Sequence, residues 1–255
     1  MSLLDDVTRV VVLHAHPDDE TLATGALLAH LSRNGVEVHV LTATRGERGG
    51  VVDGVPAAQP GTDAYAVQRE QELAGALVSL GVHHHAFLGA PPARAEGQVP
   101  RTYEDSGMTW VTATLAGPAA DAGPRALTSA DPAEVAGDVA AYLSVVEPDL
   151  LMTYDATGGY GHPDHVRLHE VGRLAAQQAG VALVEFLPRE DPQDPPTGDV
   201  ERLDLVGEYP VVAAALAHHR TQLTVEGGDV VHQGGQREPV LLTATLRRVS
   251  TLAVS

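Results

Sequence analysis

Short apolar segments alternate with segments of helical periodicity along most of this chain. Residues 8–14 form a β-branched, strand-like run, and residues 36–44 and 149–154 are similar. Leucines and alanines recur at helical spacing after Pro17 and again over residues 64–80. Strands that alternate with helices need crossover connections, which make the strands parallel. The sequence therefore predicts an α/β, Rossmann-like fold with a mainly parallel sheet and helices on both faces.

The connection after the third expected strand is unusually long. Residues 83–88 form that short strand, and residues 89–130, rich in Pro, Gly and Ala, separate it from the next helix. Loops of this length are uncommon in compact domains unless they have a function, so we expect this segment to cover a site. The next helix is expected to be capped by Asp131 and to end near Glu147.

The last third of the chain is expected to extend the sheet. Residues 188–199 are polar and Pro-rich, and we interpret them as a surface loop. A strand near Leu203, a helix over 210–223 and a strand pair ending at 240–249 follow, and these could add antiparallel edge strands. The predicted organisation is a single domain over 1–255, with a core over 1–185 and a C-terminal strand-helix-strand extension over 200–255.

The composition excludes several classes of partner and chemistry. With 16 basic and 34 acidic residues the net charge is -18, which argues against contact with nucleic acid or anionic membrane. There is no cysteine, so any metal must be held by histidine and carboxylate side chains. The N-terminus lacks a basic region, and no apolar run approaches the roughly 20 residues that span a bilayer. We expect a cytoplasmic protein.

Two expected strands end in segments of unusually high polar density. The first cluster is HAHPDDE at residues 14–20, and the second cluster is YDATGGYGHPDH at residues 154–165. In open α/β sheets, ligands bind beyond the carboxyl ends of the strands. Helix capping explains Asp and Pro at such positions, but it requires neither several histidines nor two clusters. The sequence therefore predicts a metal site.

Each cluster offers two candidate ligands three residues apart, His16 with Asp19 and His162 with His165. Zinc accepts imidazole and carboxylate when thiolate is absent, and a catalytic zinc uses three protein ligands and a water. Four candidates thus compete for three places, and spacing alone does not choose among them. Ferrous iron would accept the same ligands. His14 is interpreted as a partner of a ligand or as a core histidine.

A hydrolytic metal site also needs a base near the water. Asp18 is the natural candidate, because it is adjacent to the ligands and would stay ionised near a metal cation. His162 could be cationic and stabilise the oxyanion or protonate the leaving amine. Tyr160, flanked by glycines, could donate a hydrogen bond to the carbonyl oxygen, or it could be a loop aromatic that covers the sheet edge.

The two clusters resemble the signatures of the LmbE-like, or PIG-L, family of zinc-dependent N-deacetylases, which includes the GlcNAc-PI de-N-acetylases. These signatures stand here as AHPDDE at 15–20 and GHPDH at 161–165. The resemblance continues to about Gly180, roughly two thirds of the chain. The roles that it implies are the zinc ligands His16, Asp19 and His165, the catalytic base Asp18, the second catalytic histidine His162 and the mobile tyrosine Tyr160.

Within this family the chain is most similar to the GlcNAc-inositol deacetylases of the mycothiol pathway, because EDSGM at 104–108 resembles their D-S-G-M segment. The resemblance implies that Arg69 and Asp105 line a sugar pocket. One position departs from the family, since GERGG places Gly50 where relatives carry a glutamate that contacts sugar hydroxyls. Arg45 and Glu47 are interpreted as substrate contacts or as solvated loop residues. His218 and Gln222 have no assigned role, and the three histidines at 83–85 are interpreted as a surface run.

The expected function is that of a zinc-dependent hydrolase that removes an N-acyl group, in particular N-acetyl, from an amino sugar or GlcNAc-type glycoside. Gly50 keeps an alternative open, an amidase acting on a thiol conjugate, as in mycothiol S-conjugate amidase, or on a natural-product intermediate. A binding protein on the same fold is a further alternative, which Asp18, His162 and Tyr160 argue against because a binder needs no base. The expected partner is a small N-acylated molecule, and a homo-oligomer stays open.

Overall fold

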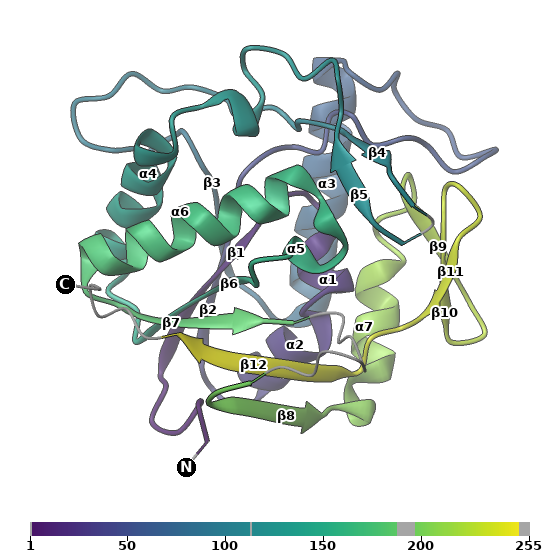
Figure 1. Ribbon diagram of the computed structural model, residues 1–255. Coiled ribbons are helices and arrows are strands. Elements are labelled where there is room, and N and C mark those ends of the chain that lie inside the picture. The colour runs from purple at the N-terminus through teal and green to yellow at the C-terminus, as the bar shows by residue number, and fades with distance from the viewer. Residues whose placement is uncertain (1, 113, 188–196, 250–255) are drawn as a thin grey trace.

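The computed structural model describes residues 2–112, 114–187 and 197–249. Its main sheet has seven strands in the order β3-β2-β1-β6-β7-β12-β8 (Figure 1). The first five are mutually parallel: β3 (His84–Phe87), β2 (Glu37–Thr42), β1 (Arg9–His14), β6 (Leu150–Tyr154) and β7 (Ala182–Phe186). The α/β prediction with a mainly parallel sheet is confirmed. Strand β7 is one that the sequence analysis did not predict.

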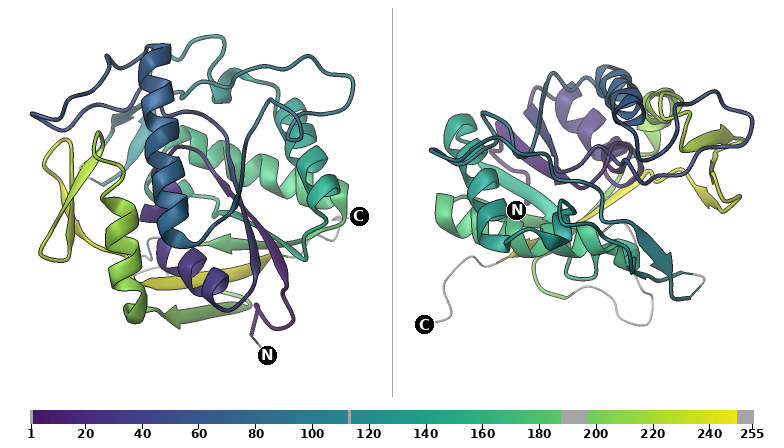
Figure 2. Two further views of the ribbon diagram at one scale, coloured as in Figure 1. Left: turned by 180° about the vertical axis from the view of Figure 1, so that it is seen from behind. Right: turned by 90° about the horizontal axis from the view of Figure 1, so that it is seen from above.

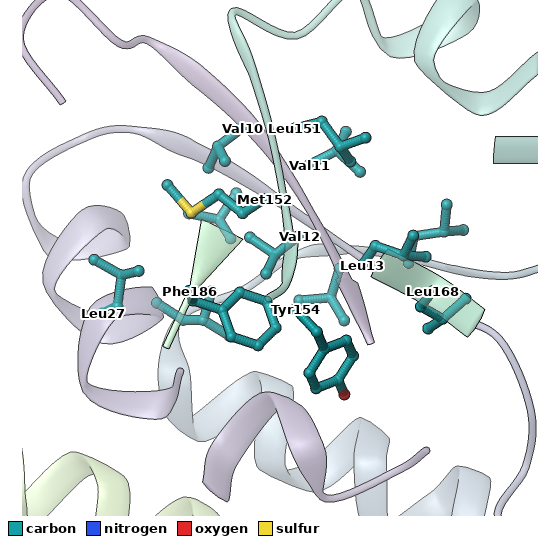
Figure 3. Packing of buried hydrophobic residues seen from close by; sticks show 14 of the residues in the cluster. Val10, Val11, Val12, Leu13, Leu27, Leu151, Met152, Tyr154, Leu168 and Phe186 are labelled. Atoms are coloured by element: carbon teal, nitrogen blue, oxygen red, sulfur yellow. The ribbon is translucent and has the colours of Figure 1, made fainter. Parts of the chain in front are cut away.

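The centre of the sheet is formed by β1 and β6, whose side chains are buried on both faces. This explains why their sequences are continuous apolar runs and not alternating ones. Figure 3 shows the side chains of these strands with those of α2 and β7, among them Val12, Leu27 and Phe186. Each fully buried Val or Leu stabilises the fold by about 1.5–3 kcal/mol. The core therefore holds the carboxyl ends of β1 and β6 in fixed positions.

Helices cover both faces of the sheet (Figures 1 and 2). One face carries α2 (Gly25–Arg33), α3 (Asp63–Leu80) and α7 (Tyr209–Leu216), and the other carries α4 (Pro132–Val146) and α6 (Pro163–Ala179). The Asp131 side chain caps α4 by accepting the N–H of Ala133, as the sequence predicts. Helix α3 ends at Gly81, whose φ of 75° lies in the left-handed region that favours glycine.

Two helices differ from the sequence-based expectation. The single helix expected after Pro17 is divided into α1 (Asp19–Leu22) and α2, and the Thr24 hydroxyl between them donates to the Glu20 carbonyl. Such side-chain hydrogen bonds compete with helical ones. The helix expected over 210–223 ends at Leu216, and the following residues turn toward β9. The sequence did not predict this end, because no Gly or Pro marks it.

The C-terminal region adds strands in two places. Strand β12 (Thr243–Val249) pairs antiparallel with β7, and β8 (Val200–Asp204) forms the edge beyond it. A separate three-stranded antiparallel sheet, which was not predicted, contains β9 (Leu223–Glu226), β10 (Asp229–His232) and β11 (Arg237–Pro239). Most of the loop expected at 188–199 lies outside the described residues.

The segment expected to cover a site contains a short hairpin. Strands β4 (Met108–Trp110) and β5 (Ala116–Pro118) pair antiparallel, and the 3₁₀ turn η1 (Leu127–Ser129) follows. Strand β5 contacts α5 (Gly158–Gly161) and α6, so this segment lies against the second cluster. Within the described ranges, no helix combines the length and apolar character needed to cross a membrane.

Candidate functional site

The two polar clusters follow strands that are direct neighbours in the sheet. The first cluster follows β1, the second follows β6, and β1 pairs with β6 in parallel register. From β1 the chain continues outward to β2 and β3, whereas β6 continues to β7 on the other side. Ligand sites in open α/β sheets form at such a reversal of strand order, beyond the carboxyl ends of the strands.

The structure brings the three predicted metal ligands into contact. The Asp19 Oδ2 atom lies 3.2 Å from His16 Nδ1 and 3.2 Å from His165 Nε2. The same oxygen accepts the backbone N–H of His16 at 2.9 Å. All three side chains are buried. His16 and His165 are 149 positions apart in the chain, yet both contact the same carboxylate oxygen of Asp19.

Each of these imidazoles is oriented by an acceptor at its other nitrogen. His16 Nε2 lies 3.1 Å from Asp164 Oδ2, and His165 Nδ1 lies 3.1 Å from the Gly158 carbonyl oxygen. A proton on those nitrogens leaves His16 Nδ1 and His165 Nε2 with lone pairs that face Asp19. Metal-binding histidines are commonly held in this way.

The arrangement fits a divalent metal ion. His165 Nε2 is buried, and no hydrogen bond of acceptable geometry reaches it from the described residues. A cation held by two imidazoles and one carboxylate would satisfy that nitrogen, and this donor set is one that catalytic zinc uses. Without a metal, burial opposes protonation of His16, but the carboxylates of Asp105, Asp164 and Asp19 prevail and raise its pKa well above the usual value.

His162 is the fourth candidate ligand. One of its ring nitrogens lies within 4.8 Å of donor atoms of His16 and His165. However, His162 Nδ1 caps α6 by accepting the N–H of Asp164 at 3.2 Å, which places the ring proton on Nε2. Burial and the neighbouring His16 and His165 lower the pKa of His162 to about 3. His162 is thus neutral with its proton on Nε2, whereas the cationic form was considered from the sequence. Among the described residues, the groups of metal-type donor atoms that lie within 4.8 Å of one another at this site contain His162 and not Asp19, so Asp19 as third ligand stays a prediction.

Asp18 has an unusual backbone conformation, with φ 124° and ψ -30°. A non-glycine residue in a sparsely populated region costs on the order of 1–3 kcal/mol, so the surroundings must hold it there. Arg69 from α3 contributes, because its Nη2 lies 3.1 Å from Asp18 Oδ2 and also donates to the Pro17 carbonyl. Burial raises the pKa of Asp18 to about 6, against the opposing charge of Arg69. A carboxylate with this pKa is suited to proton transfer near neutral pH.

Tyr160 lies in α5, beside the candidate ligands. Its ring centroid is 5.2 Å from that of His165 and 5.8 Å from that of Trp110 in the β4–β5 hairpin. Gly159 and Gly161 on either side have φ of 70° and 86°, which permits the sharp turn that presents the tyrosine. Burial and Asp19 raise the pKa of Tyr160, so its hydroxyl stays a hydrogen-bond donor at neutral pH.

The residues predicted to contact substrate are placed differently from one another. Asp105 is buried, with Oδ1 3.6 Å from His16 Nε2. Glu47 holds that segment by accepting the Asp105 N–H at 3.0 Å. Arg45 donates to Glu70 at 3.0 Å and lies over the Phe87 ring at 4.1 Å. Asp105 and Arg69 therefore border the site, whereas the described contacts of Glu47 and Arg45 are with the protein itself.

Asp164 is a site residue that the sequence analysis did not single out. It is fully buried and accepts the Ser106 N–H at 2.9 Å and the Ser106 hydroxyl at 2.5 Å, in addition to its contact with His16. Its position in the second H-P-D tripeptide was the available signal, but an aspartate there is equally expected as a helix cap. Only the fold shows that it reaches across to the first cluster.

A second group of metal-type side chains lies at the opposite end of β2. Donor atoms of Glu37, His39 and His84 lie within 4.8 Å of one another. Both nitrogens of His39 are already engaged, by Glu37 at 2.8 Å and by the Tyr142 hydroxyl at 3.1 Å, and Arg9 donates to Glu37 at 2.7 Å. His84 is exposed, as expected for the surface run at 83–85, whereas His85 is half-buried with its Nε2 atom 3.1 Å from the Thr42 hydroxyl. This group is less suited to a metal than the site beside Asp19.

Comparison with known proteins identifies the family. The family model PIG-L, described as GlcNAc-PI de-N-acetylase, matches residues 11–176, which is more than half of the chain. The chain belongs to this family. The matched region contains both polar clusters and all four candidate ligands. The protein is therefore an enzyme of the N-deacetylase type.

Two relatives extend the similarity beyond the family model. Both are named 1D-myo-inositol 2-acetamido-2-deoxy-alpha-D-glucopyranoside deacetylase. The protein from Kineococcus radiotolerans is 37% identical over 264 residues, covering 88% of this chain and 71% of its own. The protein from Actinosynnema mirum is 33% identical over 269 residues, covering 91% and 89%. The crystal structure of the zinc-inhibited form of teicoplanin deacetylase shares the fold, with a TM-score of 0.60 at 20% identity over 95% of this chain and 99% of that one.

Proposed function

We propose that this family member is a zinc-dependent hydrolase that removes the N-acetyl group from an amino sugar or GlcNAc-type glycoside. The observation that carries the proposal is the shared contact of Asp19 Oδ2 with one nitrogen each of His16 and His165, 3.2 Å in both cases. These three side chains would hold the ion. When bound, zinc supplies Lewis acidity toward a water and an amide carbonyl.

Asp18 acts as the general base in this proposal. Its carboxylate accepts a proton from the attacking water, and a pKa of about 6 leaves it largely ionised at pH 7. Arg69 holds one carboxylate oxygen at 3.1 Å and so limits the orientations that the base can take. The proton then passes from Asp18 to the amine nitrogen as the C–N bond breaks, so that acetate and a free amine leave.

His162 and Tyr160 stabilise the negative charge that develops on the carbonyl oxygen. Neutral His162 donates from Nε2, since its Nδ1 is engaged by the Asp164 N–H. The Tyr160 hydroxyl, whose raised pKa keeps it protonated, supplies a second donor. Preorganised donors of this kind typically contribute more to rate than they would in water.

The substrate is proposed from the names of the relatives and from the residues at the edge of the site. The relatives from Kineococcus radiotolerans and Actinosynnema mirum are named for a GlcNAc-inositol substrate. At Gly50, a Cβ atom would lie 1.7 Å from Gln233 Oε1, so a neutral amide occupies the space of a side chain at that position. This difference favours, as a second candidate, an amide of a thiol conjugate or natural-product intermediate.

A substrate panel tests the proposal. Zinc-loaded protein is assayed for amine release from N-acetylglucosaminyl inositol, N-acetylglucosamine and a cysteine-conjugate amide, with His16→Ala as the metal-binding control. We expect turnover of an N-acetylated amino sugar by the wild type, and loss of both zinc and turnover in His16→Ala. Turnover restricted to the cysteine conjugate would support the amidase, whereas zinc binding without any hydrolysis would support a binding protein.

A further inference from the structure

Glu20 and His219 form an ion pair in the interior that the mechanism above does not use. His219 Nε2 lies 2.8 Å from Glu20 Oε1, and both side chains are fully buried. Glu20 belongs to α1, whereas His219 lies in the turn between α7 and β9, 199 residues later. The Thr21 hydroxyl also donates to Glu20 Oε1. The pair therefore joins the first cluster to the C-terminal third of the chain.

The other oxygen of Glu20 reaches the candidate base. Glu20 Oε2 accepts the backbone N–H of Asp18 at 2.8 Å. This is the residue with φ 124°, and strained backbone persists only where its surroundings over-determine it. Glu20 thus supplies a restraint on the backbone that carries the Asp18 carboxylate.

The remaining restraints on Asp18 differ in origin. Its carbonyl accepts the N–H groups of Thr21 and Leu22 at 3.0 and 2.8 Å, which are contacts within the same short segment. Its carboxylate meets Arg69. The restraint on its N–H depends on Glu20, whose Oε1 is held in turn by His219 and by the hydroxyl of the adjacent Thr21.

Stability alone does not account for a buried pair of this kind. Removing two charges from water carries a desolvation cost that often exceeds their attraction, and well-packed apolar residues can be equally stable in the same place. A pair that holds a strained backbone amide has a function that apolar residues could not supply, because they offer no acceptor for the amide.

We propose that His219 is a positioning residue for the general base. By fixing Glu20, it holds the Asp18 backbone in its strained conformation, so that the carboxylate faces the site. This inference rests on the proposed function for the role of Asp18, but its structural part does not. His219 contacts Glu20 and acts on Asp18 through it.

The kinetic test compares variants at two adjacent histidines. His219→Asn keeps a polar side chain that is too short to reach Glu20, His219→Gln places an amide donor near the position of Nε2, and the exposed His218→Asn is the matched control. We expect His219→Asn to lower kcat by about 10- to 100-fold, since small misplacements of a catalytic group have effects of this size. KM and zinc affinity should change less than about threefold, and His219→Gln should recover most of kcat.

A crystal structure of zinc-free His219→Asn supplies a readout that does not depend on activity. We expect the Asp18 φ to leave the region near 124° and the contact with Arg69 to lengthen, while His218→Asn keeps both. If His219→Asn does not fold, the same measurements are made on His219→Gln. The inference requires this variant to keep the Asp18 backbone conformation and most of the wild-type kcat, and loss of either would overturn it.

Two results overturn the inference. One is a His219→Asn variant with a lower melting temperature but unchanged kcat, which would make the pair purely structural. The other is an unchanged Asp18 backbone in its crystal structure. Absence of any hydrolysis by the wild type would instead contradict the proposed function, and the crystal structures would still decide whether His219 holds the Asp18 backbone.

Discussion

The first and second clusters contain the same tripeptide, H-P-D, followed by one further ligand-type residue, yet the fold uses matching positions differently. His16 and His162 begin the two tripeptides. His16 Nδ1 faces Asp19 at 3.2 Å, whereas His162 Nδ1 accepts the Asp164 N–H at 3.2 Å and caps a helix. A shared spacing therefore nominates ligands, but it does not assign them.

The aspartates of the two tripeptides diverge as well. Asp18 Oδ2 turns to Arg69 at 3.1 Å, whereas Asp164 Oδ2 reaches back to His16 Nε2 at 3.1 Å. The cause is the backbone, because Asp18 precedes a four-residue helix with φ 124°, while Asp164 lies in the first turn of the 17-residue α6. In the proposed function, one aspartate accepts a proton and the other orients a ligand.

Replacing Asp18 tests the first half of this contrast and should have the largest effect. Asp18→Asn keeps the shape of the side chain but removes the proton acceptor, so kcat should fall by about 10²- to 10⁴-fold. Zinc content, measured by a chromophoric chelator, should stay at the wild-type value. A variant with normal turnover would show that Asp18 is not the base.

Replacing Asp164 tests the second half. Asp164→Asn weakens the acceptor that orients His16, so the Kd for zinc should rise by about 10- to 100-fold. At saturating zinc, kcat should be restored to a much greater degree than in Asp18→Asn. The assignment of the two aspartates fails if Asp164→Asn binds zinc normally and loses turnover instead.

The pH dependence of zinc affinity sharpens the description of the ligand set. Because neighbouring carboxylates raise the pKa of His16 in the metal-free protein, a proton must leave before the imidazole can bind metal. Lower pH favours the protonated form, so zinc affinity should fall as pH falls, by about tenfold per unit if one proton is displaced. Titrations at pH 6, 7 and 8 measure this, and a pH-independent Kd would contradict it.

The smallest effect is expected at Ser106, in the segment that covers the second cluster. Its N–H and hydroxyl both donate to Asp164, and Ser106→Ala removes the second of these. The Kd for zinc should rise by up to about tenfold, the lower end of the range for partners of metal ligands. Thr112→Ala, in the exposed tip of the hairpin, is a control that should bind zinc as the wild type does.

Local patterns were sufficient for much of the fold. The apolar run of β1, the helix α3 with its glycine stop and the Asp131 cap of α4 are each encoded within a few residues. Strand β7 and the small sheet of β9–β11 were not predicted, because their segments are short and depend on pairing with distant strands. At the division between α1 and α2, the Thr24 hydroxyl donates to the Glu20 carbonyl, a contact that competes with helical hydrogen bonds.

The sequence alone identified the donor groups of the two clusters, because a metal site requires particular side chains. The same two segments also indicated membership in a family of N-deacetylases. Which nitrogen of each imidazole points inward, which aspartate supports a ligand and how His219 reaches Glu20 were decided by the folded chain alone. The contact of His16 with Asp164 joins residues 148 positions apart, and that of His219 with Glu20 joins residues 199 positions apart. Only the sheet that places β1 beside β6 and the return of α7 bring them together.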